Sequence, residues 1–319
     1  MQTLTHPRAP TGFLNKSASP QLQSARPLHH FKIPYLLKSD TAMTAIAIWC
    51  NQENDSTPSL WVAADSRVTS PNRAILVEDA AKVIGLPIVC RSPGPTGFFS
   101  NIYYEHTIGY CFAGSTLMGQ NSYLGFAPML SNLISPTGYV PSMADIARHV
   151  LALLRLTFDE YKFRVGQGAV FEAAIFGFCH RNNKLSTYHF HPEMIDGTVQ
   201  LTSTAYEGMR ANEFAYLGDE GESMRANIAR AFAGEATPGR PLSRAPRYVI
   251  QDRIDDETSE SIGGDIQLGI ADRFGFRPLT LCKPRAHGQS AAYMSYLGRE
   301  LTDDIGYVGE AMVAITGMI

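Results

Sequence analysis

The sequence predicts an α+β protein in which helices pack against antiparallel sheets. Strand-like and helix-like segments come in separate runs: strands, two helices, strands, two helices, and strands again. Segregated runs of this kind are typical of sheets covered by helices, and not of a parallel sheet with alternating helices. The 319 residues are 45% hydrophobic and 18% charged, which suits one large or two ordinary domains with a sizeable core.

The first run contains four segments rich in residues that favour strands. A polar, turn-forming stretch over 51–59 joins the first two segments into a hairpin, and a loop rich in Gly, Pro and Ser over 91–100 separates the last two. The predicted strands are 44–50, 59–64, 81–89 and 107–112.

Two helices are predicted next. The first covers 115–133, and Pro128 is expected to kink or split it. The second covers 142–161, where Ser142 and Asp145 resemble a capping box and apolar residues recur at helical spacing.

The second half of the chain brings strands, two helices and strands again, with no internal repeat of sequence. Turns at 181–184 and 271–275 each join two strands into a hairpin. The predicted strands are 171–179, 185–190, 201–206, 213–217, 266–270 and 278–281, and the predicted helices are 222–232 and 247–256.

The two ends differ from this body. Residues 1–42 hold five prolines, three histidines and no acid before Asp40, and they lack apolar periodicity. Such a segment buries too little surface to offset its ordering entropy. Residues 1–43 are therefore expected to be a disordered leader, a propeptide or sequence upstream of the true start. The folded domain is expected over 44–286, and 287–319 is expected to dock on the body or to contact another subunit.

Composition excludes several classes of protein. A net charge of −3 argues against a globally basic nucleic-acid binder. The five scattered cysteines lack metal-ligand spacing and are expected to be reduced thiols. No apolar stretch approaches the roughly 20 residues of a membrane span, and no signal peptide is visible. We expect a cytoplasmic protein without metal, nucleic-acid or membrane partners, in which His180, His189 and His191 are surface residues.

Thr44 follows Met43 and opens the first predicted strand. A threonine hydroxyl is a weak nucleophile unless a base takes its proton, and a free α-amine on the same residue, with a pKa of about 7.7–8.0, can do so. This chemistry requires Thr44 to be the first residue of the mature chain. Removal of Met43 would achieve this if translation starts there. Without supporting context, a threonine here is an ordinary strand former.

Three further motifs provide that context. Ala64-Asp65-Ser66-Arg67 ends the second strand, Lys82-Val83 follows with Lys82 seventeen residues after Asp65, and Ala113-Gly114-Ser115 lies between a strand and a helix. With Thr44, this succession resembles the proteasome β-subunit family and its bacterial relatives, the HslV peptidase and the Anbu proteins. These are N-terminal-nucleophile hydrolases, which commonly have a glycine-rich turn like Gly263-Gly264. The resemblance covers roughly 44–283 and implies a four-layer αββα sandwich, two antiparallel sheets flanked by helices.

The resemblance also implies a role for each motif residue. Thr44 would supply the Oγ nucleophile and its own amine the general base. Lys82 would place a positive charge beside that oxygen, and Asp65 would hold Lys82 in position. The Gly114 N–H would donate to the oxyanion of the tetrahedral intermediate. Arg67 would orient Asp65.

By the same resemblance, an apolar pocket beside the nucleophile would accept a hydrophobic side chain of the substrate. The residues implied to line this pocket are Val68, Ala80, Ile84, Phe112 and Thr116.

The sequence departs from the family pattern at several places. Insertions lengthen the loops at 51–59 and 91–106. The supporting serine of a Gly-Ser-Gly turn is replaced by acids in the segment 218–221. The family's Asp-x-x-Ser before the double glycine is also absent, and Ser261 stands in for its serine.

The function implied is that of a threonine peptidase without a cofactor, acting on peptides or unfolded proteins. It would work inside a homo-oligomeric ring or related assembly, with a separate ATPase unfoldase as a partner. Two alternatives remain: an amidohydrolase of the same superfamily acting on a small amide, and a structural subunit without activity. Replacing Lys82 by Ala is expected to reduce activity far more than stability.

Overall fold

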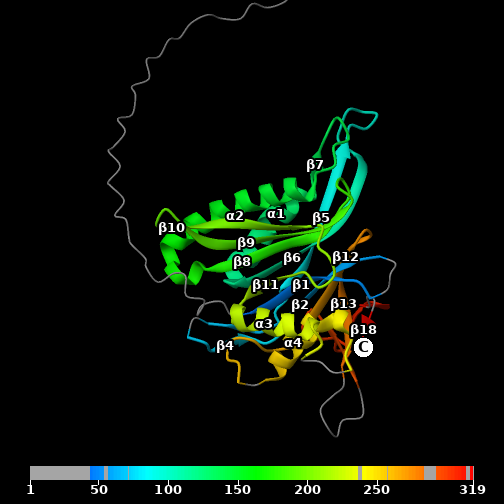
Figure 1. The fold of residues 1–319 in the computed structure, drawn as a ribbon. Helices are drawn as coiled ribbons and strands as arrows, with labels where there is room; N and C mark the ends of the chain where they lie inside the picture. The colour runs from blue at the N-terminus through cyan, green and yellow to red at the C-terminus, as the bar shows by residue number, and fades with distance from the viewer. Residues whose placement is uncertain are drawn as a thin grey trace, which may run out of the picture. The chain divides into compact units, whose positions relative to one another are not determined.

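The computed structural model describes residues 44–53, 57–70, 72–235, 239–256, 258–283, 292–313 and 317–318. All of them belong to one compact unit, Pro34–Ile319. In this unit two sheets lie against each other, and two helices cover the outer face of each sheet (Figure 1). The predicted leader, 1–43, lies outside the described residues.

The first sheet is built around the N-terminal hairpin. β1 pairs antiparallel with β2 on one side and with β11 on the other, and β12 adds to the far edge of β2. β13, β14 and β15 continue the sheet, and β18 pairs parallel with β13. The bounds are β1 Ala45–Asn51, β2 Ser59–Ala64, β11 Phe214–Gly218, β12 Gln267–Asp272, β13 Gly275–Lys283, β14 Tyr293–Tyr296, β15 Arg299–Glu300 and β18 Gly317–Met318.

The second sheet has the order β10-β9-β8-β6-β5-β7, antiparallel except for the short β7. Its bounds are β5 Val83–Ser92, β6 Asn101–Gly114, β7 Leu133–Ile134, β8 Phe171–Cys179, β9 Lys184–Ile195 and β10 Thr198–Glu207. The β5–β6 hairpin is longer than the sequence predicted, and its distal end projects beyond the helices in Figure 1.

Helices α1 (Thr116–Leu130) and α2 (Met143–Val165) cover the second sheet, while α3 (Gly221–Phe232) and α4 (Ala245–Asp255) cover the first. Pro128 does not split α1, because only two helical residues follow it. The capping box is present at α2: Asp145 N–H donates to Ser142 Oγ and the Ser142 N–H donates back to Asp145. The remaining short elements are η1 Gly166–Ala169, η2 Leu242–Arg244, β3 Val68–Thr69, β4 Ile75–Val77, β16 Tyr307–Val308 and β17 Ala311–Met312.

Three apolar cores hold these layers together. One lies between α1, α2 and the second sheet, one between the two sheets, and one between the first sheet and α3 and α4. β1 serves two of them: Trp49 faces α3 and α4, whereas Ile46 and Ile48 face the other sheet. Both faces of this strand are therefore buried, which explains why its sequence is apolar throughout and does not alternate.

All five cysteines are free, and Cys282 is the exposed one. In the described part of the chain, no helix is long and apolar enough to cross a membrane.

Candidate functional site

Where β1 begins and β2 ends, a buried ammonium bonds both a hydroxyl and a carboxylate. Lys82 Nζ lies 2.8 Å from Thr44 Oγ1 and 2.9 Å from Asp65 Oδ1. Thr44 and Lys82 are each 2% exposed and Asp65 is 0% exposed. The three residues that the sequence predicted are thus brought into direct contact from three separate segments.

Lys82 makes three hydrogen bonds through Nζ, the third to the backbone oxygen of Arg67 at 2.5 Å. An ammonium has three N–H donors and no acceptor, so this geometry satisfies the charged form completely. Burial lowers the pKa of Lys82, and the charge of Asp65 opposes that shift. Burial likewise raises the pKa of Asp65, while Lys82 and two backbone N–H groups lower it.

Asp65 is held by the main chain as well as by Lys82. The Ala45 N–H donates to Oδ1 at 3.0 Å, and the Gly263 N–H donates to Oδ2 at 3.2 Å. Asp65 therefore joins the start of β1 to the glycine-rich turn that the sequence singled out before β12. A carboxylate with this many donors has one orientation available, which in turn positions Lys82.

Gln267 is a site residue that the sequence did not indicate. Its side chain is buried, and its Oε1 accepts from the Lys82 N–H at 3.0 Å. Its Nε2 donates to the backbone oxygens of Asp65 at 3.2 Å and Ala80 at 2.8 Å. This one amide ties together the backbones that carry the carboxylate and the ammonium.

Arg67 acts differently from the predicted role of orienting Asp65. Its guanidinium bonds Glu78 Oε2 at 3.0 Å and the Ser259 carbonyl at 3.1 Å, and it packs over Gly263, where an added Cβ would lie 2.2 Å from Arg67 Cζ. Since Gly263 donates to Asp65, Arg67 reaches the carboxylate through the turn and not by direct contact. Its direct contribution to the site is the backbone oxygen that accepts from Lys82.

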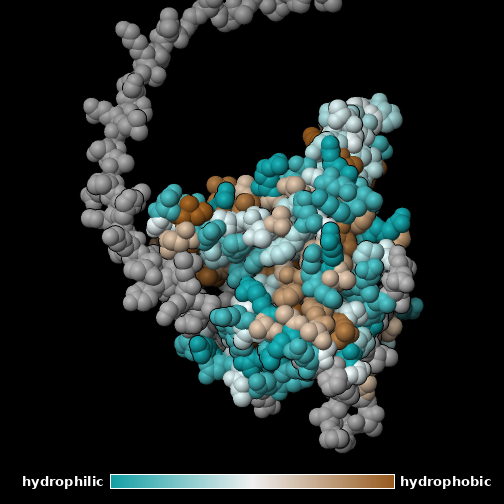
Figure 2. Space-filling model, viewed as in Figure 1, coloured by the Kyte–Doolittle hydropathy of each residue, from teal (hydrophilic) through white to brown (hydrophobic). Residues whose placement is uncertain are grey.

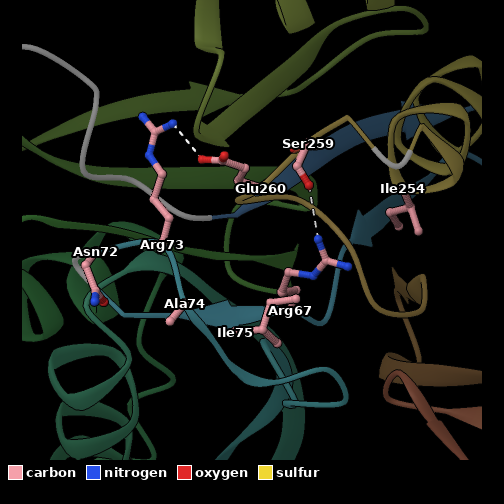
Figure 3. Close-up of a pocket in the computed structure, with 8 residues that line it drawn as sticks. All are labelled: Arg67, Asn72, Arg73, Ala74, Ile75, Ile254, Ser259 and Glu260. Carbon is pink, nitrogen blue, oxygen red and sulfur yellow. Dashed lines mark hydrogen bonds and ion pairs between the residues drawn. The ribbon is translucent and has the colours of Figure 1, made fainter.

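Arg67 also lines a cleft of about 600 Å³, whose lining residues are drawn in Figure 3. Arg73 reaches across it to Glu260, with Nη1 3.0 Å from Oε2. The cleft contains charges of both signs. Arg73 bonds Glu260 and Arg67 bonds the Ser259 carbonyl, so both arginines hold the turn at 259–261.

The other side of Thr44 meets the loop after β11. The Asp219 N–H donates to the Thr44 carbonyl at 2.7 Å, and Gly218, at φ +105°, allows the close approach: an added Cβ there would lie 1.9 Å from that oxygen. Ser261 Oγ donates to Asp219 Oδ2 at 2.6 Å. The acid that replaces a family serine thus contacts the predicted Ser261, and burial raises its pKa.

Gly114 ends β6 at φ +87°. An added Cβ would lie 2.7 Å from the Val170 carbonyl, so only glycine fits. Its neighbour Ala113 lies against Gly218, which borders Thr44. Gly114 therefore lies at the same end of the sheets as the predicted nucleophile.

Three of the five residues predicted to line a pocket border one cavity. A cavity of about 540 Å³ is lined by the predicted Val68, Ala80 and Thr116. Ile84 and Phe112 lie elsewhere, because their side chains point from their strands into the core beneath α1 and α2, where Phe112 packs on Gly119. The lining residues that the sequence did not indicate are Val77, Asp79, Ala81, Gln120, Tyr296, Leu297, Arg299 and Leu301.

One expectation about histidines was wrong. His189 is buried, and its Nε2 lies 2.6 Å from Glu172 Oε2. His191 bonds Thr204 on the neighbouring strand, and His180 is exposed as expected. In the chain as described, no group of three or more His, Cys, Asp or Glu side chains has a metal-binding arrangement.

The site therefore consists of a threonine hydroxyl at the start of a strand and a buried lysine that contacts this hydroxyl and is held by an aspartate.

No protein-family model matches the sequence. No curated protein matches it either.

Solved structures of Anbu proteins are among those similar to this chain at low identity. The helical assembly of the Anbu complex from Pseudomonas aeruginosa shares 15% identity and covers 82% of this chain and 87% of its own, with a TM-score of 0.48. Anbu (ancestral beta-subunit) from Yersinia bercovieri shares 14% identity and covers 71% and 81%, with a TM-score of 0.46. At TM-scores below 0.5, neither likeness carries functional weight.

Proposed function

We propose that this protein is an N-terminal-nucleophile hydrolase that cleaves amide bonds through Thr44, acting as a threonine peptidase. The observation that carries the proposal is the buried contact of Thr44 Oγ1 with Lys82, itself held by Asp65. A threonine placed only to form a strand needs no charged partner, and burying an ammonium beside its hydroxyl is costly. The fold proposed with it is the four-layer αββα sandwich, which the three apolar cores and two helix-covered sheets support.

The reaction requires a free amine on Thr44. In the printed chain, the Thr44 nitrogen belongs to the peptide bond with Met43. That bond must be cleaved, either by processing of the longer chain or by removal of Met43 if translation starts there. The amine then takes the Oγ proton while Oγ attacks the substrate carbonyl carbon. The Lys82 ammonium stabilises the negative charge of the attacking oxygen, and the Gly114 N–H donates to the oxyanion.

Collapse of the tetrahedral intermediate breaks the amide C–N bond. The protonated amine of Thr44 gives its proton to the leaving nitrogen, and an ester links the acyl group to Oγ. Water then attacks the ester carbonyl, again with the amine as base. This step releases the acid and restores the Thr44 hydroxyl, so no cofactor is needed.

The groups beside Thr44 differ from the family pattern. The family aspartate before the double glycine is absent, while Asp219 brings a carboxylate from the other loop to Ser261. Asp219 also bonds the Thr44 carbonyl through its own N–H. We propose that Asp219 and Ser261 together replace the family's supporting groups.

The proposed substrate is a peptide or an unfolded protein with an apolar side chain next to the cleaved bond. The cavity beside the site supports this, because aliphatic residues form much of its lining. A homo-oligomer is proposed as the working form. Exposed apolar residues on α1 and α2 support it, and Figure 2 shows hydrophobic residues on the outer side of α2. A separate ATPase unfoldase is a further proposed partner.

The decisive experiment compares two forms of the protein on fluorogenic peptide amides. A chain produced to begin at Thr44 is expected to hydrolyse them, and the chain beginning at Met1, if its processing is blocked, is expected to be inactive. Thr44→Ala in the short form should abolish hydrolysis, whereas Thr44→Ser should retain part of it. Full activity of the Thr44→Ala variant would reject the nucleophile assignment.

An inactive structural subunit is the second candidate, because Thr44 follows Met43 in the printed chain and its nitrogen is acylated there. Intact mass and N-terminal sequencing of the protein from its native cell separate the two. A chain that begins at Thr44 favours the hydrolase, and a chain that retains Met1 favours the structural subunit.

A further inference from the structure

The pocket beside Thr44 has one wall that comes from the C-terminal extension. Val68, Ala80 and Thr116 line one part of the cavity, whereas Tyr296, Leu297 and Leu301 come from the β14–β15 hairpin and the residue after it. This hairpin belongs to the segment 287–319, which the resemblance to the proteasome family does not cover. Its side chains have no place in the mechanism proposed above.

The cavity adjoins the site through the chain itself. Val68 follows Arg67, whose carbonyl accepts from Lys82, and Ala81 precedes Lys82. Thr116 lies two residues after Gly114. When the carbonyl carbon of a substrate lies at Thr44, the substrate side chain next to the cleaved bond can therefore enter this cavity.

Several contacts hold the hairpin in this position. β14 pairs antiparallel with β13, and Ser295 Oγ donates to Asp265 Oδ2 at 2.6 Å. At the tip, Gly298 packs closely on Ser66, where an added Cβ would lie 2.4 Å from Ser66 Cβ, and it also contacts Gln267. Arg299 Nε lies 2.7 Å from Asp79 Oδ2, which joins the hairpin to the opposite wall of the cavity.

Leu297 occupies an unusual position for its residue type. The two loop residues of the hairpin, Leu297 and Gly298, have φ of 53° and 80°. Such a two-residue turn favours Asn-Gly or Gly-Gly, and a bulky apolar side chain there is strained. Among the described non-glycine residues with positive φ, Leu297 is the apolar one. Leu297 lines the cavity, which gives a reason for leucine at a strained position.

We infer that the β14–β15 hairpin is a specificity element, and that Leu297 sets the size of the apolar substrate side chain accepted beside the cleaved bond. This inference rests on the proposed hydrolase function. With Leu297 in this wall, we expect a substrate side chain of leucine size to be accepted more readily than an aromatic ring. Leu297 is a specificity-determining residue and takes no part in the chemical steps.

The test compares Leu297→Ala and Leu297→Asn with the wild type, and all three chains begin at Thr44. Asn suits the turn better than Leu, so a changed profile in Leu297→Asn cannot be due to a weakened hairpin. Val308→Ala is the matched control, since Val308 is exposed in the same extension and does not line the cavity. The substrates are fluorogenic acetylated tripeptide amides that differ only in Ala, Leu or Phe before the cleaved bond.

The wild type is expected to prefer Leu. In Leu297→Ala the ratio of kcat/KM for Phe over Leu should rise about tenfold, the scale of a few methylene groups in an apolar pocket. The change should appear mainly in KM, because the groups that act on Thr44 are untouched. Leu297→Asn should lower the preference for Leu over Ala about tenfold, and Val308→Ala should leave all ratios within about twofold.

A second readout separates this inference from the proposed function. Binding of N-acetyl-leucine amide to the full chain is measured by NMR, with wild type, Leu297→Asn and Val308→Ala. Hydrolysis with unchanged ratios in both Leu297 variants overturns the specificity element and leaves the hydrolase standing. If the protein hydrolyses nothing but binds the amide, and only Leu297→Asn weakens this binding, the hydrolase is overturned. The role of Leu297 in the pocket wall then stands. If the protein neither hydrolyses the peptides nor binds the amide, both the specificity element and the hydrolase are overturned.

Discussion

At the scale of single residues, Lys82 and Asp65 depend on each other. Both are buried, and Lys82 Nζ lies 2.9 Å from Asp65 Oδ1, so each charge is compensated by the other. Removing one partner leaves an uncompensated charge inside the protein, which typically costs about 3–5 kcal/mol. The expectation that Lys82→Ala reduces activity far more than stability therefore needs amending, since this geometry makes the single substitution costly for both.

A double-mutant cycle measures this dependence. Lys82→Met and Asp65→Asn should each lower the free energy of unfolding by about 3–5 kcal/mol. The double variant holds no buried charge at either position, so its loss should be smaller than the sum by about 2 kcal/mol or more. Urea unfolding at pH 7 gives the four values. Strict additivity would mean that the two side chains do not form a pair in solution.

The sequence indicated Thr44, Asp65 and Lys82 because each lies in a recognisable motif. Gln267 and the pairing of Asp219 with Ser261 carried no such signal. A glutamine in a strand is common, and Asp219 and Ser261 are 42 positions apart in the chain. Only the register of β2 with β12, in which Ala64 lies opposite Gln267, places that amide beside the two charged residues.

At the scale of elements, some strands and helices have the predicted bounds, whereas β6 and β9 run five or six residues beyond theirs. β8 matches its predicted bounds and α3 differs by one residue, since apolar patterning and turn residues bound both. The sequence missed β3, β4 and β14, which are two to four residues long. Strands of that length have too few residues to show alternation, and pairing with a neighbour decides whether they form.

The β5–β6 hairpin contains a buried titratable group, His106 on β6. No partner for its Nε2 is found among the described residues. Burial, followed by the nearby His180, lowers its pKa from 6.5 to about 4, and the charge of Asp272 opposes the shift. Above pH 6.5 the imidazole is neutral in both folded and unfolded chains, so it has no effect on stability there.

Below pH 6.5 the unfolded chain binds a proton that the folded protein resists. The folded state should therefore lose up to about 3 kcal/mol as the pH falls from 6.5 to 4, at 1.36 kcal/mol for each unit of pKa. In His106→Gln this loss should be absent, which urea midpoints at pH 7, 5.5 and 4.5 will show. His149→Gln, on the exposed side of α2, is the control and should follow the wild type. Parallel curves for all three proteins would contradict the low pKa of His106.

At the scale of the whole molecule, the order of element types along the chain predicted helices packed on antiparallel sheets, and the described residues form such layers. The C-terminal extension was the least predictable part. Its strand β14 extends the first sheet beyond β13, and no local sequence pattern indicates that pairing. The predicted subunit contact of this extension remains a prediction, as does the homo-oligomer.

Exposed apolar side chains on the outer surface of α1 and α2 make this surface a second candidate for a contact between copies of the chain. Leu156 is 70% exposed and Phe163 is 79% exposed on α2, and Leu124 is exposed on α1 beside a groove of about 280 Å³ between the two helices. Side chains of this size are rarely left in water on a helix that already buries its other face. If the protein assembles through this surface, a second copy would cover these residues.

Replacing Leu156 and Phe163 together by Ser should therefore convert an oligomer into smaller species. Both side chains are exposed within one chain, so the substitutions should leave its free energy of unfolding within about 0.5 kcal/mol. Light scattering after size-exclusion chromatography measures the mass of each form. Val308→Ser is the comparison, because Val308 is equally exposed in the C-terminal extension. Dissociation of the Val308 variant alone would place the contact in the extension, because the helix surface would then have no role in assembly.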